Sequence, residues 1–150
     1  MMEQAIERLE YLCNVIPKLL ENIPEAEFTS KTTPDKWSRK EILGHLIDSA
    51  TNNHQRFVRA VNKVTAQFPT YDQNEWVRIQ RYNERPWESL VTLWSACNNH
   101  LSHVIEYIPE VAESSPCNIG NEDPVPLDFV IKDYLRHLRH HLKDILGEQA

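Results

Sequence analysis

The sequence is poor in residues that interrupt helices or favour sheets. Only 3 of its 150 residues are glycine, and runs of β-branched residues are scarce, which favours helices over strands. No stretch approaches the roughly 20 apolar residues that a membrane-spanning helix needs. The hydrophobic share of 41% and the charged share of 25% are ordinary for a globular protein. We therefore expect one all-α domain over residues 1–150, which is long enough for a substantial core.

Positive charge is also in short supply. The formal net charge is −6, and the sequence shows no evident basic face, whereas nucleic-acid-binding proteins usually have one. The first residues, MMEQAIERLEYL, include acidic side chains near the start and lack a cleavage site of small residues. We therefore expect no secretory signal peptide. Neither nucleic acid nor a membrane is expected as a partner.

Cysteine is rare and widely spaced. Cys13, Cys97 and Cys117 are odd in number and lack metal-binding or redox spacing. Their simplest interpretation is that they are reduced thiols in a cytoplasmic protein. The sequence also lacks a glycine-rich phosphate loop and a nucleophile elbow. These absences leave the histidines as the main candidates for chemistry.

Apolar side chains recur at helical spacing in four long segments. The expected helices cover about residues 2–23, 39–64, 86–108 and 127–146, with a shorter helix over about 72–82. Ser38 and Glu41 form a capping box at the start of the second helix, whereas Pro17 should kink or split the first. The long connections 24–37 and 109–126 leave room for crossovers. The pattern predicts a four-helix bundle.

Two histidines lie on the inward-facing line of the expected last helix. His137 and His141 are four residues apart, so their imidazoles leave one helix face about 6 Å apart along the axis. They interrupt the line of Val130, Tyr134 and Ile145. Burial of unpaired imidazoles is unfavourable, whereas two rings at this spacing can bind one metal ion. At this point a metal site and a pair of satisfied core histidines both stay open.

His45, in the expected second helix, is the candidate third ligand. It lies at the border of the apolar face of that helix, where a lone histidine is most often satisfied or exposed. Gly44 precedes it, at an interior position where glycine costs about 1 kcal/mol relative to alanine. Close approach of a neighbouring helix beside His45 would explain this glycine. His100 and His103 are a second pair, but they lie on helix flanks and are expected to be solvated.

Three motifs occur in order along the chain. They are Trp37-Ser38 followed by KEILGHLIDSATNNHQRF, then YDQNEW, and then DYLRHLRHHLKDIL. Their order and spacing resemble the DinB-like superfamily, in its YfiT-like branch, across nearly the whole chain. The resemblance implies a single four-helix-bundle domain with up-down-down-up topology, long crossover loops and one short extra helix.

The same resemblance implies a divalent metal ion held by three histidines, commonly zinc or nickel. Carried over to this sequence, the ligands are His45, His137 and His141. Imidazole suits both metals, and three protein ligands leave positions open for water or substrate. Relatives are described as metal-dependent hydrolases, or as transferases or isomerases that use low-molecular-weight thiols. Asp144 departs from the thiol-transferase pattern, in which this position often carries another histidine.

Four further residues are candidates to contact a substrate. They are Asn52, Arg56, Gln73 and Trp76, although ordinary surface or core roles stay open for them. Beyond the histidines no general base is evident, so no catalytic residue is assigned. We expect a small cytoplasmic metal-dependent enzyme acting on a small molecule such as a thiol, either a hydrolase or a thiol S-transferase. The alternative is a metal- or ligand-binding module of the same fold without turnover. The resemblance also makes a homodimer plausible.

Overall fold

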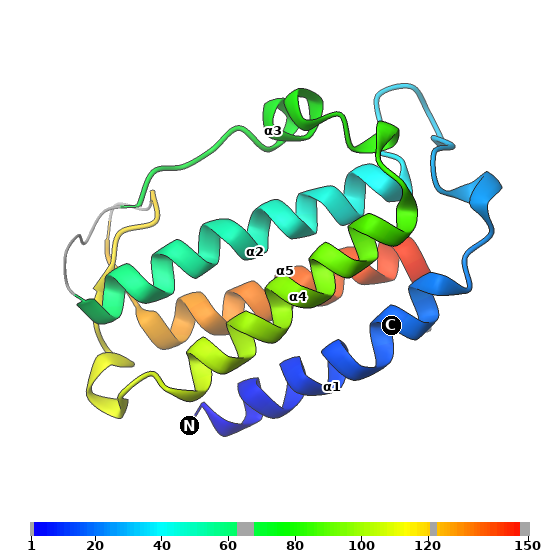
Figure 1. Cartoon of the computed structure of the whole chain (residues 1–150). Helices are drawn as coiled ribbons and strands as arrows, with labels where there is room; N and C mark the ends of the chain where they lie inside the picture. Colours follow the sequence, from blue (N-terminus) through cyan, green and yellow to red (C-terminus); the bar gives the residue numbers. More distant parts are fainter. Residues whose placement is uncertain (1, 63–67, 121–122, 148–150) are drawn as a thin grey trace.

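The computed structural model describes residues 2–62, 68–120 and 123–147 (Figure 1). Within these ranges the long helices are α1 (Glu3–Glu21), α2 (Arg39–Asn62), α4 (Trp87–Glu106) and α5 (Leu127–Leu146). The short elements are α3 (Gln73–Gln80), the 3₁₀ turns η1 (Glu25–Glu27), η2 (Tyr82–Glu84) and η3 (Glu110–Ala112), and the two-residue strands β1 (Pro116–Cys117) and β2 (Val125–Pro126). The strands pair antiparallel, with Pro116 opposite Pro126.

The four long helices form a bundle with up-down-down-up topology. Figure 1 shows α1 and α5 running in one direction and α2 and α4 in the other. Because α2 and α4 are parallel neighbours, the chain between them returns along the outside of the bundle, and α3 lies on this return. The expected fold is therefore confirmed. No helix among the described residues is both long and apolar enough to cross a membrane.

The helix boundaries follow local signals in the sequence. The backbone N–H of Glu41 donates to Ser38 Oγ at 3.1 Å, and the Glu41 carboxylate accepts from the Ser38 N–H at 3.0 Å, which confirms the capping box. The backbone N–H of Gly147 donates to the Lys143 carbonyl where α5 ends. The second helix is described to Asn62, so its expected end near residue 64 lies outside the described residues.

Of the two effects expected of Pro17, a kink or a split of the first helix, the split does not occur. α1 continues from Glu3 to Glu21 with Pro17 inside it. Proline removes one backbone hydrogen bond, but Ile16 and Leu20 on either side of it are buried in the core at 1% and 0% exposure. Packing of this apolar face therefore holds the helix together through the proline.

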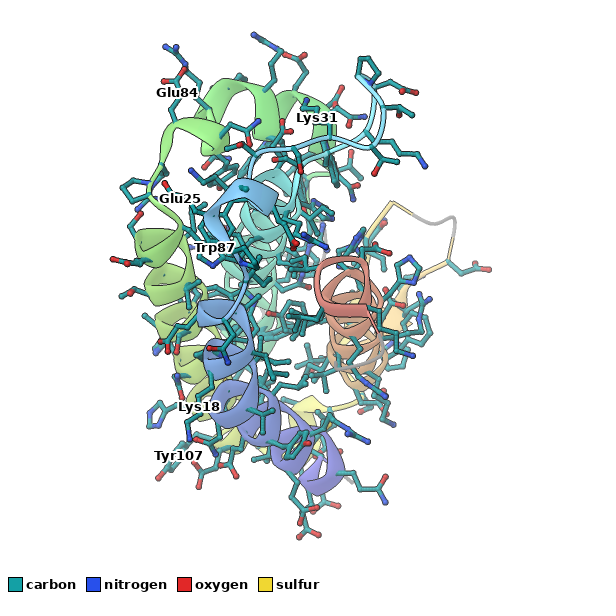
Figure 2. The ribbon with its side chains drawn as sticks, turned by 90° about the vertical axis from the view of Figure 1, so that its right-hand side faces the viewer. Lys18, Glu25, Lys31, Glu84, Trp87 and Tyr107 are labelled. Atoms are coloured by element: carbon teal, nitrogen blue, oxygen red, sulfur yellow. The ribbon has the colours of Figure 1, made fainter. Side chains whose placement is uncertain are left out.

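The connection between α1 and α2 is fixed to the end of the bundle by aromatic packing. The rings of Phe28 and Trp87 stack with centroids 4.5 Å apart, and Trp87 Nε1 donates to the Leu20 carbonyl at 2.9 Å. Figure 2 shows Trp87 next to the connection that carries Glu25. The backbone N–H of Lys40 donates to the Phe28 carbonyl at 3.0 Å. These contacts hold residues 24–37 against the bundle, close to the first turns of α2 where His45 lies.

Candidate metal centre

α2 and α5 bring three imidazoles together. Nε2 of His45 lies 3.1 Å from Nε2 of His137, and one ring nitrogen from each of His45, His137 and His141 lies within 4.8 Å of the other two. Two nitrogens bound to one tetrahedral ion at about 2.0–2.1 Å would be roughly 3.3 Å apart. The short separation and the chemistry of the three donors therefore fit a single metal ion.

The remaining histidines do not join this group. His140 is exposed although it is adjacent to His141 in sequence. His100 and His103 are also exposed, as expected from their place on the flanks of α4. Among the described residues, His45, His137 and His141 are the one set of three or more metal-ligating side chains with this geometry.

Burial keeps the three imidazoles unprotonated near neutral pH. Desolvation, reinforced by the neighbouring histidines, lowers the pKa of His45 to about 3 and that of His137 to about 4. Burial also lowers the pKa of His141, although the Asp144 carboxylate opposes this shift. A metal ion binds the neutral form of imidazole. The folded chain thus presents these rings in the form that a ligand requires.

Trp37 and Asp144 orient the histidine rings, and neither role was predicted from the sequence. The Trp37 ring packs on His45 with centroids 4.7 Å apart. Nδ1 of His141 lies 3.2 Å from an Asp144 carboxylate oxygen, an arrangement that fixes Nδ1 as the donor and leaves Nε2 free for an ion. Asp144, the position that departs from the thiol-transferase pattern, is therefore a partner of His141. The helical spacing of three between them was the available signal.

The neighbour that requires Gly44 is a side chain and not a helix, so the expected reason for this glycine is corrected. A Cβ at position 44 would lie 2.1 Å from Cδ2 of Tyr82. The Tyr82 hydroxyl donates to Asp48 Oδ1 at 2.6 Å, and Gln80 Nε2 donates to the same oxygen at 2.8 Å. Asp48 is buried. This network fixes the segment that follows α3 against α2, one turn from His45.

Two cavities flank the three histidines. The first, of about 310 Å³, lies between α2 and α5 and reaches His137; the second, of about 500 Å³, reaches His141. The first is lined by Ser49, Asn53, Arg56, Thr70, Tyr71, Gln73, Ile119, Val130, Asp133, Tyr134 and His137. The second is lined by Thr32, Asp35, Lys36, Trp37, Ile42, Asn74, His141 and Asp144. Each cavity therefore gives a ligand access to one of the histidines.

Of the four residues expected to contact a substrate, Arg56 and Gln73 line the first cavity. Asn52 does not line it, and its side-chain amide donates to the Asp48 carbonyl at 2.8 Å. Trp76 does not line it either, but its ring packs on the ring of Tyr71, which does, with centroids 4.9 Å apart.

Ser49 and Asn53 line the first cavity and were not assigned to a site by sequence reasoning. Both are buried in α2, and the Asn53 amide donates to the Ser49 carbonyl at 2.8 Å. Polar residues on the apolar stripe of a helix were the signal that could have identified them, because such residues are uncommon in a core.

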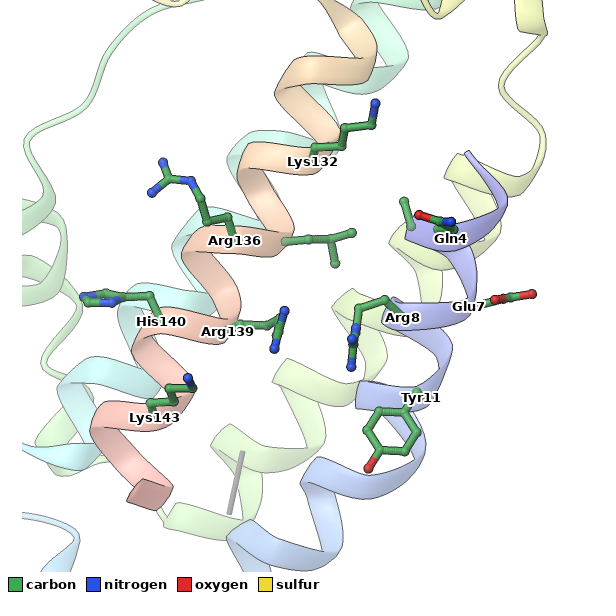
Figure 3. A pocket seen from close by; sticks show the side chains of 11 residues that line it. Gln4, Glu7, Arg8, Tyr11, Lys132, Arg136, Arg139, His140 and Lys143 are labelled. Carbon is green, nitrogen blue, oxygen red and sulfur yellow. The ribbon is translucent and has the colours of Figure 1, made fainter. Parts of the chain in front are cut away.

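A third hollow lies away from the histidine cluster, between α1 and α5 (Figure 3). Figure 3 shows Arg8 on α1 and Arg139 on α5 pointing toward one another from opposite sides. Lys132, Arg136 and Lys143 also line it. No basic face was evident from the sequence, but these side chains gather positive charge in this groove. Neither His45, His137 nor His141 lines it.

A family model for the DinB superfamily matches residues 8–145. The chain belongs to the DinB superfamily. A protein named "putative metal-dependent hydrolase" from Halalkalibacterium halodurans is 20% identical over 144 residues, which are 96% of this chain and 84% of that one. A protein of the same description from Oceanobacillus iheyensis is 22% identical over 134 residues, covering 87% of this chain and 77% of its own.

Solved structures confirm the superfamily fold. YfiT from Bacillus subtilis, described as a probable metal-dependent hydrolase with an unusual four-helix bundle topology, has a TM-score of 0.85 at 16% identity, and the match covers 95% of this chain and 82% of YfiT. A mycothiol-dependent maleylpyruvate isomerase has a TM-score of 0.80 at 18% identity. That match covers 100% of this chain but 62% of the isomerase. At these identities the likeness concerns the fold.

Proposed function

We propose that this member of the DinB superfamily is a metal-dependent enzyme whose divalent ion is bound by His45, His137 and His141. The observation that carries the proposal is the convergence of three neutral imidazoles from two helices, with ring nitrogens within 4.8 Å of one another. Imidazole donors favour zinc or nickel over magnesium or calcium, which prefer oxygen ligands.

The surroundings of the histidines suit catalysis better than a structural role. Structural zinc sites are closed by four protein ligands, whereas catalytic sites use three and keep a position open. Here two members of the three-histidine set each line a cavity, His137 the first and His141 the second. When bound, the ion would supply Lewis-acid activation of a substrate donor group. The protein would orient His141 through Asp144 and hold His45 against Trp37.

The proposed substrate is a small molecule, and the reaction is hydrolysis or transfer of a low-molecular-weight thiol. The names of the Halalkalibacterium and Oceanobacillus relatives support hydrolysis, and the likeness to a mycothiol-dependent isomerase supports thiol chemistry. Among the proposed substrate contacts, Arg56 and Gln73 have direct access through the first cavity. All three cysteines are free thiols, so the compartment we propose is the reducing cytoplasm.

Metal analysis of the purified protein tests the ligand set. We expect about one ion per wild-type chain and a large loss in His141→Ala, because two ligands hold a metal more weakly than three. His140→Ala is the matched control, since this neighbouring histidine is exposed and lies outside the cluster. Equal metal content in wild type and His141→Ala would overturn the proposal.

A second candidate is a module that binds a metal or small ligand without turnover. It is favoured by the state of the two carboxylates whose charges act on His137 and His141: Asp144 is placed against His141, and Asp133 accepts a hydrogen bond from Arg136. Neither is a free general base. Metal-loaded protein should therefore be assayed with esters and amides, and with thiols plus electrophiles. Turnover that is lost in His45→Ala supports the enzyme, whereas no turnover across these panels supports the module.

A further inference from the structure

We propose that the cavity between α2 and α5 selects substrates that carry a carboxylate, and that Arg56 is the residue that binds it. The inference rests on the proposed function, because it places the reacting end of the substrate at the three histidines. It adds the class of substrate and the residue that determines specificity.

The cavity extends along α2 from the histidines to Arg56. His45, Ser49, Asn53 and Arg56 follow one another at spacings of four, four and three, so they share one face of the helix. The helical rise from residue 45 to residue 56 is about 16 Å. A long arginine side chain in a helix leans toward the helix N-terminus, which shortens this distance from the guanidinium to the histidines.

α5 forms the facing wall of the same cavity. It runs antiparallel to α2, so the residues that precede His137 lie progressively farther from the site (Figure 1). Tyr134 and Val130 lie one and two turns from His137 and line the cavity. The cavity therefore has the histidine cluster at one end and Arg56 toward the other.

Arg56 supplies the positive charge in the described lining of this cavity. No other lysine or arginine lines it, and Arg56 makes no ion pair with any described residue. Asp133, the one acidic residue in the lining, accepts from Arg136 Nε at 3.1 Å, and Arg136 lies outside the cavity. A half-buried guanidinium that has no ion-pair partner among the described residues is suited to a carboxylate, which it can bind through two parallel hydrogen bonds.

The positive charge of Arg56 acts on another residue that lines the cavity. Burial raises the pKa of the Tyr71 hydroxyl, and the positive charge of Arg56 opposes that rise. Tyr71 lines the cavity beside Gln73. The guanidinium is therefore close enough to the lining residues to act on a bound ligand.

The second cavity does not offer the same selectivity. Its one lysine, Lys36, is accompanied by two carboxylates, Asp35 and Asp144. These acidic groups would disfavour an anionic ligand on the His141 side. An anionic substrate end is thus directed to the cavity on the His137 side.

Few polar groups in the middle of the first cavity are free to hydrogen-bond a ligand. The Asn53 amide is already donated to the Ser49 carbonyl, and the Tyr134 hydroxyl donates to Asn98. Specificity should therefore come from the two ends, with a neutral spacer between them. The volume of about 310 Å³ is at the lower limit for small-molecule pockets, so the substrate must be small.

A cobalt-loaded protein tests this inference without an assay for turnover. Thiols that bind cobalt as thiolates, with release of the proton to buffer, change its absorption spectrum, so dissociation constants follow from titration. The probes are 6-mercaptohexanoate and 3-mercaptopropionate, each compared with its neutral methyl ester. In wild type we expect 6-mercaptohexanoate to bind about tenfold or more tightly than its ester. The shorter pair should discriminate less, because its carboxylate does not reach Arg56.

Three variants assign the effect to Arg56. Arg56→Gln should abolish the preference for the acid, and Arg56→Lys should keep part of it, because lysine retains the charge but not the planar fork. Arg59→Gln is the matched control: Arg59 is exposed on the same helix and bonds Gln55, so its loss should leave the preference unchanged. Equal cobalt content in all four proteins would show that the metal site is intact.

The outcomes separate this inference from the proposed function. If cobalt is not bound, or is bound equally by His141→Ala, the proposed function fails and the inference fails with it. If cobalt and thiols bind but wild type does not distinguish acid from ester, the inference alone is overturned. A preference for the acid that survives in Arg56→Gln would also overturn it.

Discussion

At the scale of single residues, glycine is required at position 44 because a neighbouring side chain leaves no room for a Cβ, and not because of the backbone conformation. Alanine would gain about 1 kcal/mol in helix propensity, but its Cβ would lie 2.1 Å from the Tyr82 ring. The ring cannot move easily, since its hydroxyl is bonded to the buried Asp48. Overpacking of this kind costs about 1–3 kcal/mol. We expect Gly44→Ala to lower the free energy of unfolding by about 1–2 kcal/mol, measured by urea denaturation.

The control for Gly44→Ala removes the ring. In a Tyr82→Ala background the clash is absent, so Gly44→Ala should stabilise the protein by up to about 1 kcal/mol through helix propensity. The double-mutant cycle isolates the contact between the two positions. A cost of Gly44→Ala that stayed the same without the ring would show that Tyr82 is not its cause.

The buried histidines should make the metal-free protein sensitive to mild acid. Desolvation lowers the pKa of His45 to about 3 and that of His137 to about 4, whereas the value in an unfolded chain is 6.5. Between these values the unfolded chain binds protons that the folded chain does not, so stability is full above pH 6.5 and falls as the pH decreases toward 4. The urea midpoint of metal-free protein should therefore decrease from pH 7 to pH 5.

A variant that lacks one of the buried histidines provides the comparison for this acid sensitivity. His45→Gln should show a weaker dependence of the urea midpoint on pH between 7 and 5, while His140→Ala, which changes an exposed ring, should retain the wild-type dependence. A wild-type midpoint that is flat over this range would contradict the prediction.

Site residues could be predicted from the sequence where a single helix contains the whole pattern. His137 and His141 share α5, so their spacing of four is sufficient to place both rings on one face. His45 could be assigned only from the resemblance to the superfamily. It is 92 residues from His137 in sequence, and its approach depends on how α2 packs on α5. The contact between Trp37 and His45 depends on the course of a loop, and no periodic pattern describes a loop.

At the scale of secondary-structure elements, the start of α2 is the boundary closest to the site. Ser38 is 1% exposed, its hydroxyl accepts from the Glu41 N–H and it donates to the Asn83 side chain. Ser38→Ala removes the cap and leaves Asn83 without this donor, so we expect a loss of about 1–2 kcal/mol in the free energy of unfolding. Ser30→Ala, at an exposed position before the helix, should change it little. Equal effects of the two substitutions on urea denaturation would contradict the role of the cap.

Helices could be predicted from this sequence more reliably than the connections between them. A long amphipathic stripe repeats its signal over several turns, and the stripes identified all four long helices. β1 and β2 contain two residues each, so they carry no periodicity from which to predict them. Their pairing is a consequence of how residues 116 and 126 are brought together beside α5.

At the scale of the whole molecule, charge is distributed unevenly over an acidic chain. The net charge is −6, yet five lysine and arginine side chains line the groove between α1 and α5: Arg8, Lys132, Arg136, Arg139 and Lys143. Four of them lie within residues 132–143 at spacings of four, three and four, which place them on one face of α5, and Arg8 joins them from α1. Homodimerisation stays a prediction, which sedimentation measurements on the purified chain would test.

The metal centre joins α2 to α5, so a bound ion should stabilise the whole bundle. The unfolded chain retains the His137–His141 pair but not the approach of His45, so an ion binds the folded state more tightly. At a free metal concentration about 100 times the dissociation constant, this stabilisation is about 2.7 kcal/mol, or roughly 5–10 °C in Tm for a chain of this size. Zinc or nickel added to chelator-treated protein should produce this rise in wild type and in His140→Ala. His45→Ala should lose most of it, because its remaining ligands lie on one helix and no longer connect two. An equal rise in His45→Ala would mean that the ion binds elsewhere.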